Sequence, residues 1–230
     1  MPKDCKIILV FDLDDTLYDE KTYVLSGFRA VAAHLKRKYR LNSDKTYNFM
    51  LKDLKANGRG KIFNNILSKY SLENKKRIRE LLSVYRKHKP KMKLFGDSER
   101  ILNRFKNLPL YVVTDGNVNV QSNKCRALKL EKYVDKIFIT YRYGIENAKP
   151  STHCFKKILK LENSNPENLV YIADNPKKDF VNLNSEGYKT IRIMRGMFKD
   201  FKAAKGYDAK HRIKSLDEIT TRFINSLITK

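Results

Sequence analysis

An α/β fold with a doubly wound parallel sheet is the class that this sequence predicts, because short apolar segments alternate with helical patterns. Five segments have the length and composition of buried strands, near residues 6–11, 110–114, 136–140, 169–173 and 189–193. Helical patterns separate the later ones. Strands that alternate with helices form a parallel sheet covered on both faces.

The long interval between the first two strands carries only helical periodicity. Apolar residues recur at helical spacing across 24–35, 62–67 and 78–85. We therefore expect a helical domain at 18–93, inserted into a core of residues 1–17 and 94–230. The core resumes with a helix near 97–105, and the capping-box pattern at 215–218 predicts the start of a C-terminal helix.

Length and composition limit the class of protein. With 230 residues, 41% of them hydrophobic, the chain can bury a substantial core. No apolar run approaches the ~20 residues of a membrane span, and the first six residues lack the layout of a signal peptide. Three scattered cysteines without a C-x-x-C pair argue against a disulfide framework or zinc site. We expect a cytoplasmic protein that does not enter membranes.

The formal net charge of +24 has two interpretations. It could attract polyanions such as nucleic acid. It could also reflect a lysine-rich composition spread over solvated faces, which is the interpretation that we favour because the basic residues look dispersed along the chain. Nucleic acid is therefore the less favoured partner, although it is not excluded.

The end of the first predicted strand carries the chemistry. Asp12 and Asp14 stand two residues apart, directly after an apolar run, where open α/β sheets bind ligands. Closely packed carboxylates repel one another and need a cation, and oxygen ligands favour Mg²⁺. A magnesium site around a nucleophilic carboxylate is the first expectation.

Further polar groups follow at intervals along the chain. Thr114 and Asp115 end the second strand, Lys149 precedes Pro150 at a predicted helix start, and Asp174 ends a later strand with Asp179 five residues on. Together with Asp12, Asp14 and Thr16, these residues resemble the motifs of the haloacid dehalogenase-like (HAD) superfamily of phosphohydrolases, in their order. The inserted helical region is similar to the C1-type cap of that superfamily.

The resemblance implies a Mg²⁺-dependent phosphomonoester hydrolase that acts on a small phosphorylated metabolite, a sugar phosphate or a nucleoside monophosphate. Asp12 would form an aspartyl-phosphate, and Asp14 would act as general acid and then as base. Asp14 must be protonated in the first step, so a pKa raised by its acidic neighbours would help that step.

The resemblance also implies the other site residues. The metal ligands would be Asp12, Asp174 and Asp14, the last through its backbone carbonyl. Asp179 would orient Lys149 and the metal shell, and the substrate would be bound by Thr16, Thr114, Asp115 and Lys149.

Two alternatives remain open at this point. A phosphomutase shares Asp12 and Asp14 but keeps water from the aspartyl-phosphate. A basic nucleic-acid-binding protein, or a phosphatase acting on nucleic-acid ends, would give the charge a function. The sequence predicts no oligomeric state.

Overall fold

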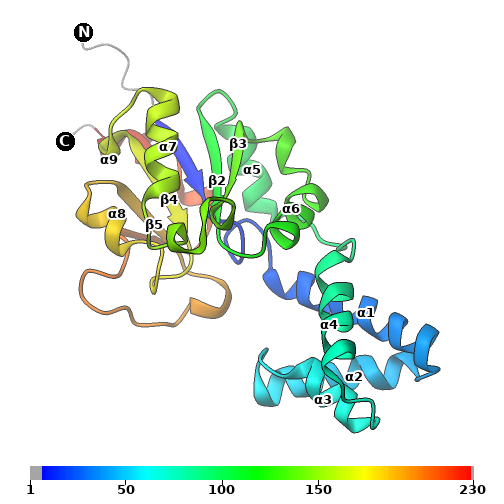
Figure 1. Ribbon diagram of the computed structural model, residues 1–230. Coiled ribbons are helices and arrows are strands. Elements are labelled where there is room, and N and C mark those ends of the chain that lie inside the picture. The colour runs from blue at the N-terminus through cyan, green and yellow to red at the C-terminus, as the bar shows by residue number, and fades with distance from the viewer. Residues whose placement is uncertain (1–6, 229–230) are drawn as a thin grey trace. The chain divides into compact units, whose positions relative to one another are not determined.

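Six parallel strands form one sheet in the order β3-β2-β1-β4-β5-β6, in a computed structural model that describes residues 7–228 (Figure 1). The strands are β1 (Ile8–Phe11), β2 (Leu110–Thr114), β3 (Lys136–Ile139), β4 (Leu169–Ala173), β5 (Lys189–Ile193) and β6 (His211–Ile213). This confirms the doubly wound α/β fold and the first five strands, although residue 6, where the first was expected to begin, lies outside the described residues. β6 was not predicted because two of its three residues are polar and exposed.

The register brings three strand ends to the same level. Phe11, the last residue of β1, pairs with Val112 of β2 on one side and with Ile172 of β4 on the other. The strand order reverses around β1, which creates the crevice where open sheets bind ligands. The residues that follow β1, β2 and β4 therefore meet at one edge.

Both faces of the sheet are buried. Ile8 and Val10 of β1 pack in one apolar cluster with residues of α7 (His153–Glu162) and α8 (Val181–Ser185), and α7 crosses this face in Figure 1. The alternate residues Leu9 and Phe11 are equally buried. A sheet covered on both faces explains why its strands read as continuous apolar runs.

The C-terminal segment differs from the prediction in one respect. Ser215 and Glu218 do form the capping box, but it caps a 3₁₀ turn over Leu216–Glu218. Ile219 then leaves the helical conformation, with φ −80° and ψ 87°, and is completely buried, which interrupts the helix. α9 therefore begins at Thr221 and runs to Ile228. Two further helices, α5 (Gly96–Arg104) and α6 (Val118–Ala127), precede and follow β2.

The chain divides into two compact units. The core unit comprises Met1–Glu20 with Met92–Lys230, and the helical unit comprises Lys21–Lys91. The helices with residues in the helical unit are α1 (Glu20–Tyr39), α2 (Ser43–Asn57), α3 (Ile62–Lys69) and α4 (Lys75–Lys87). Asn42 and Asn74 cap α2 and α4, and the helices pack around their own apolar cluster. Within residues 7–228, no helix has the length and apolar content needed to cross a membrane.

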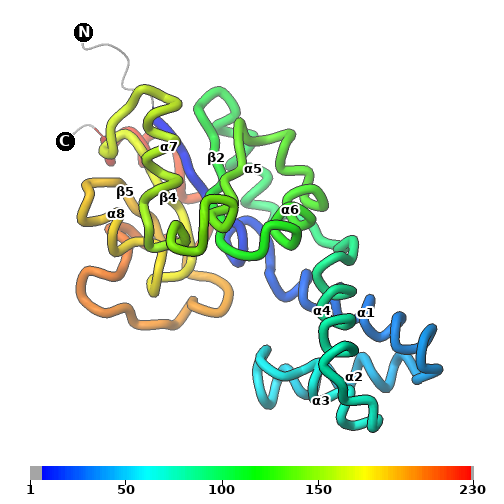
Figure 2. The backbone as a smooth tube through the Cα atoms, viewed as in Figure 1, coloured from blue at the N-terminus to red at the C-terminus, as the bar shows by residue number. Residues whose placement is uncertain are grey.

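A long loop joins β5 to β6, drawn in orange in Figure 2. The buried Arg192 anchors it by donating to the carbonyl oxygen of Phe201 at 2.9 Å and by pairing with Asp208. Asp15 accepts the backbone N–H of Met197 at 3.2 Å. The adjacent Gly196 has φ +67°, and a Cβ there would lie 2.3 Å from the Cβ of Asp15, so only glycine fits without displacement.

Candidate active site

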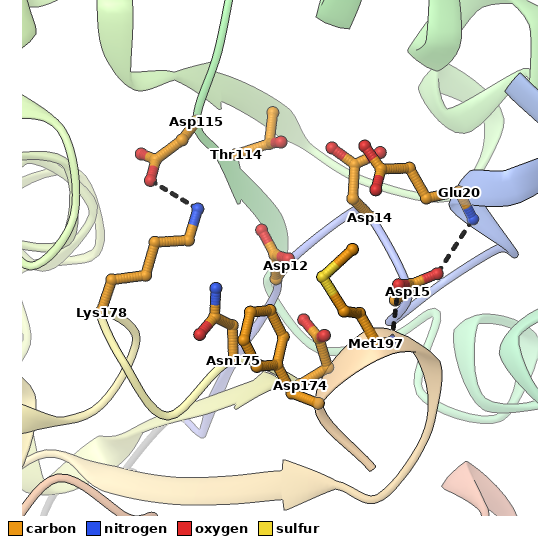
Figure 3. Close-up of a pocket in the computed structure, with 11 residues that line it drawn as sticks. Asp12, Asp14, Asp15, Glu20, Thr114, Asp115, Asp174, Asn175, Lys178 and Met197 are labelled. Atoms are coloured by element: carbon orange, nitrogen blue, oxygen red, sulfur yellow. Dashed lines mark hydrogen bonds and ion pairs between the residues drawn. The ribbon is translucent and has the colours of Figure 1, made fainter. Parts of the chain in front are cut away.

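A pocket in the core unit gathers residues that follow β1, β2 and β4 (Figure 3). It holds about 600 Å³ of free space, part of it open to solvent. Most of its wall is polar. The lining residues are Asp12, Asp14, Asp15, Glu20, Thr114, Asp115, Asp174, Asn175, Lys178, Met197 and Phe198.

Asp12 lies at the centre of this group (Figure 3). Its backbone N–H donates to the carbonyl of Ile172 at 2.9 Å, which fixes it against β4. Its Oδ1 accepts a hydrogen bond from Lys149 Nζ at 2.7 Å, whereas its Oδ2 has no partner among the described residues. Burial raises the Asp12 pKa to about 7, although Lys149 opposes the shift. One oxygen is thus held by the protein and the other is available for a ligand.

Lys149 is buried and fully engaged. Its ammonium contacts Asp12 Oδ1 and Asp179 Oδ1, both at 2.7 Å, and donates to the Tyr171 hydroxyl at 2.9 Å. Burial would lower the Lys149 pKa, but Asp12 and Asp179 raise it well above its usual value. Lys149 does not line the pocket. In this arrangement its charge neutralises Asp12, and the substrate contact expected from the sequence stays a prediction.

Three buried carboxylates could hold a cation. One oxygen each of Asp12, Asp174 and Asp179 lie within 4.8 Å of one another. Asp174 is 4% exposed, and its carboxylate has no hydrogen-bond or ion-pair partner among the described residues. Burial, followed by the charge of Asp12, raises the Asp174 pKa to about 9. A buried carboxylate without a counter-charge is a site that a cation would stabilise.

Asp179 has less capacity to bind a metal directly. Its Oδ1 contacts Lys149 and accepts from the Tyr171 hydroxyl at 3.1 Å, and its Oδ2 accepts the backbone N–H of Asn175 at 3.1 Å. Both oxygens are therefore used within the protein. This geometry suits the orienting role that the sequence predicts for Asp179, and it leaves the carboxylates of Asp12 and Asp174 as the groups that could hold a cation.

Asp14 is held by three side chains. Its Oδ1 accepts from Lys124 Nζ at 2.7 Å and from the Tyr18 hydroxyl, and its Oδ2 accepts from Gln121 Nε2 at 3.0 Å. Burial raises the Asp14 pKa, but Lys124, Tyr18 and Gln121 outweigh it and lower the pKa overall. The raised pKa that would help a general acid is not found in this arrangement, because Lys124 is buried beside the carboxylate.

The predicted substrate-binding residues differ in where they lie. Thr114 lines the pocket, and its hydroxyl accepts from Gln121 Nε2 at 2.6 Å. Thr16 does not line the pocket, because its side chain is completely buried and its hydroxyl has no partner among residues 7–228. Asp115 lines it, but its carboxylate accepts from Thr140, Lys178 and the Lys149 backbone N–H.

Several lining residues were missed by sequence reasoning. Lys178 and Asn175 lie between Asp174 and Asp179 in a strand-end loop, and that position is the sequence signal for them. Met197 and Phe198 follow β5 and had no motif to mark them. Asp15 also lines the pocket and accepts the backbone N–H of Glu20 at 3.0 Å.

The family model described as haloacid dehalogenase-like hydrolase matches residues 9–193. The chain belongs to this family. The match spans the three strand ends that form the pocket, and it confirms the resemblance drawn from the sequence motifs. The protein is thus a hydrolase on the HAD fold.

Comparison with characterised proteins points in the same direction. The glyceraldehyde 3-phosphate phosphatase of Methanocaldococcus jannaschii is 29% identical over 223 residues, which cover 92% of this chain and 94% of the relative. That of Pyrococcus furiosus is 27% identical over 202 residues, covering 84% and 82%. A solved structure of the HAD hydrolase YfnB from Bacillus subtilis, bound to magnesium, has a TM-score of 0.65 at 16% identity and covers 95% of this chain and 98% of its own. That likeness shows the fold.

Proposed function

We propose that this protein is a Mg²⁺-dependent phosphomonoester hydrolase that acts on a small phosphorylated metabolite through an aspartyl-phosphate. The observation that carries the proposal is Asp12, which presents one unpartnered oxygen to the pocket while Lys149 holds the other at 2.7 Å. A carboxylate held in this way can act as a nucleophile. The two phosphatase relatives, which align over most of their length, support phosphate esters as the substrate class.

The residues present fit a magnesium ion. The carboxylates of Asp12 and Asp174 would hold it, together with the backbone carbonyl of Asp14. The unpartnered Asp174 carboxylate supports this assignment. When bound, the metal supplies positive charge against the phosphoryl oxygens.

The two proposed steps use Asp12 and Asp14. A carboxylate oxygen of Asp12 attacks phosphorus, the bond from phosphorus to the ester oxygen breaks, and that oxygen takes a proton from protonated Asp14. Because Lys124, Tyr18 and Gln121 lower the Asp14 pKa in this arrangement, Asp14 must take up that proton before the first step. Water then attacks the aspartyl-phosphate, Asp14 takes the water proton, and the bond from phosphorus to Asp12 breaks. Inorganic phosphate and free Asp12 result, and each proton is accounted for.

We further propose that the helical unit serves as the cap of this hydrolase and that the substrate is a sugar phosphate. The similarity to glyceraldehyde 3-phosphate phosphatases supports a triose phosphate as the first candidate. Nucleoside monophosphates are the second candidate.

A panel of phosphomonoesters tests the function. We would measure phosphate release from glyceraldehyde 3-phosphate, glycerol 3-phosphate, phosphoserine, nucleoside monophosphates and 5′-phosphorylated oligonucleotides, with Mg²⁺ and with excess chelator. We expect a triose phosphate to be hydrolysed fastest and chelator to stop turnover. Full activity in chelator would contradict the metal site, and faster release from oligonucleotide ends would contradict the small-metabolite substrate.

A further inference from the structure

The charges of the pocket wall are unbalanced. Six carboxylates line it, from Asp12, Asp14, Asp15, Glu20, Asp115 and Asp174. Among the described residues that line the pocket, Lys178 alone carries a positive charge. A phosphate monoester arrives with up to two negative charges, so it needs cationic partners beyond a single metal ion.

Lys149 cannot supply that contact in this arrangement. Its three N–H donors are directed to Asp12, Asp179 and the Tyr171 hydroxyl, and its side chain is 1% exposed. A new acceptor could bind only by displacing one of these partners. The positive charge of Lys149 therefore acts on the Asp12 carboxylate.

Lys178 has the opposite character. Its side chain is 34% exposed, and its ammonium makes one hydrogen bond among the described residues, to Asp115 Oδ2 at 2.9 Å. Two of its three N–H donors thus remain for a ligand. Figure 3 shows the amine at one side of the group, directed toward Asp115, which lies next to Thr114.

Asp115 is fixed from its other side. Its Oδ1 accepts from the Thr140 hydroxyl at 2.7 Å and from the Lys149 backbone N–H at 3.1 Å. Burial raises the Asp115 pKa, but Lys149 and Lys178 outweigh it and lower the pKa. The carboxylate is therefore a firm, ionised anchor with one oxygen for Lys178.

We propose that Lys178 binds the phosphoryl oxygens of the substrate directly and that Asp115 is the positioning residue that directs its ammonium into the pocket. The proposal rests on the proposed function, since it names a binding group for the same phosphate. It gives Asp115 a different role from the direct substrate contact expected from the sequence. The competing explanation is an ion pair that only stabilises the fold.

Four variants separate these explanations: Lys178→Gln, Lys178→Arg, Asp115→Asn and the control Lys177→Gln. Lys177 is the exposed neighbour in the same loop and does not line the pocket. For each variant we would measure kcat and KM with p-nitrophenyl phosphate, inhibition by inorganic phosphate, phosphate binding by titration calorimetry with Mg²⁺ present, and Tm.

Lys178→Gln should raise KM and weaken inorganic phosphate binding at least ~10-fold, the effect expected for losing a charge-assisted hydrogen bond. Lys178→Arg should restore part of the affinity because it keeps the charge but changes the geometry. Asp115→Asn should have a smaller effect of the same kind, and Lys177→Gln should match the wild type.

Phosphate binding by Lys178→Gln within about 2-fold of the wild type would overturn the inference, even if its Tm falls. If the wild type binds phosphate but hydrolyses no phosphomonoester, the proposed function fails, while the calorimetric comparison still decides the role of Lys178. A wild type that neither binds phosphate nor hydrolyses its esters would overturn both.

Discussion

The core unit and the helical unit carry their charge in opposite ways. The helical unit holds 20 of the 49 lysines and arginines but 4 of the 25 acidic residues, which gives it +16 of the formal net charge of +24. All but one of those 20 side chains are exposed. The core unit instead buries carboxylates at the edge of its sheet, where Asp12, Asp174 and Asp179 are at most 5% exposed.

This difference shows that net charge and active-site charge are separate features of the molecule. The total of +24 gives no indication of a pocket whose wall is mostly acidic. It also corrects the expectation of an even spread, because two thirds of the excess lies in residues 21–91. If the two features are separate, phosphomonoester turnover should depend on the buried charges of the core unit and should not change when the surface charges of the helical unit are removed.

The largest effect is expected from the same substitution made in each unit. Asp12→Asn should lower kcat at least ~10³-fold, because an amide is a poor nucleophile and cannot balance a metal ion. Asp44→Asn, at an exposed position in the first turn of α2, should leave kcat unchanged. Steady-state turnover of p-nitrophenyl phosphate measures both, with circular dichroism to confirm folding. Near-normal turnover by a folded Asp12→Asn protein would rule out the covalent mechanism.

A second prediction distinguishes the role of Asp14 from that of Asp12. Asp14→Asn should lower kcat/KM ~10²-fold for glycerol 3-phosphate, whose leaving alkoxide needs a proton, and only a few-fold for p-nitrophenyl phosphate, whose leaving phenolate does not. Comparing the two esters in one preparation cancels any loss of folded protein. Equal losses for the two esters would show that Asp14 does not act as the general acid.

Part of the site could be predicted from the sequence because some of its residues have a recognisable sequence pattern. Asp12, Thr114 and Asp174 could be found because each is a polar residue that ends an apolar strand, and parallel strands end at a common edge. The family resemblance added Lys149 and Asp179, which the structure brings within 2.7 Å of each other.

The rest could not be predicted because it depends on side-chain partners. Three features depend on residues that are far apart in the sequence. They are the ion pair of buried Lys149 with Asp12, the lowered pKa of Asp14 beside Lys124, and the hydrogen bond from Lys178 to Asp115. Lys178 looked like one of many surface lysines, and neither β6 nor the late start of α9 has a clear sequence pattern.

The third prediction concerns metal and pH, and it follows from the raised pKa of Asp174. Its folded-state pKa of about 9 lies above the ordinary 3.8, so the folded protein binds that proton more tightly between these values. Without metal, the contribution of Asp174 to stability should therefore fall as pH rises through that window. Mg²⁺ takes the place of the proton, so the stabilisation by Mg²⁺ should grow with pH.

Thermal unfolding measures this linkage. Near pH 8.5, a Mg²⁺ concentration about 100-fold above the Kd should raise Tm by about 5 °C. At the same Mg²⁺ concentration near pH 5, the rise in Tm should shrink toward zero. Asp174→Asn should lose most of the Mg²⁺ effect at the higher pH. A Tm shift that does not depend on pH, or that persists in Asp174→Asn, would contradict the assignment of Asp174 as a ligand.

The smallest effect is expected where the charge of the helical unit is reduced. Lys75, Lys76 and Arg79 are exposed on α4, and Lys156, Lys157 and Lys160 are a matched set on α7 of the core unit. If the surface charge acts collectively, replacing the α4 set with Gln should weaken oligonucleotide binding at low salt about 10-fold, and replacing the α7 set about 2-fold.

Both triple variants should hydrolyse p-nitrophenyl phosphate as the wild type does, because buried contacts are screened less than surface ones. Fluorescence anisotropy over a salt series measures the binding, and turnover is followed over the same series. We expect wild-type binding to be weak and to fall steeply toward physiological salt, since it arises from release of counterions by exposed lysines. Binding that persists at physiological salt and is lost in the α4 variant would make the helical unit a genuine nucleic-acid surface. In that case the two units would have separate functions, hydrolysis in the core unit and nucleic-acid binding in the helical unit. The positive charge of the helical unit would then not be explained by a lysine-rich composition alone.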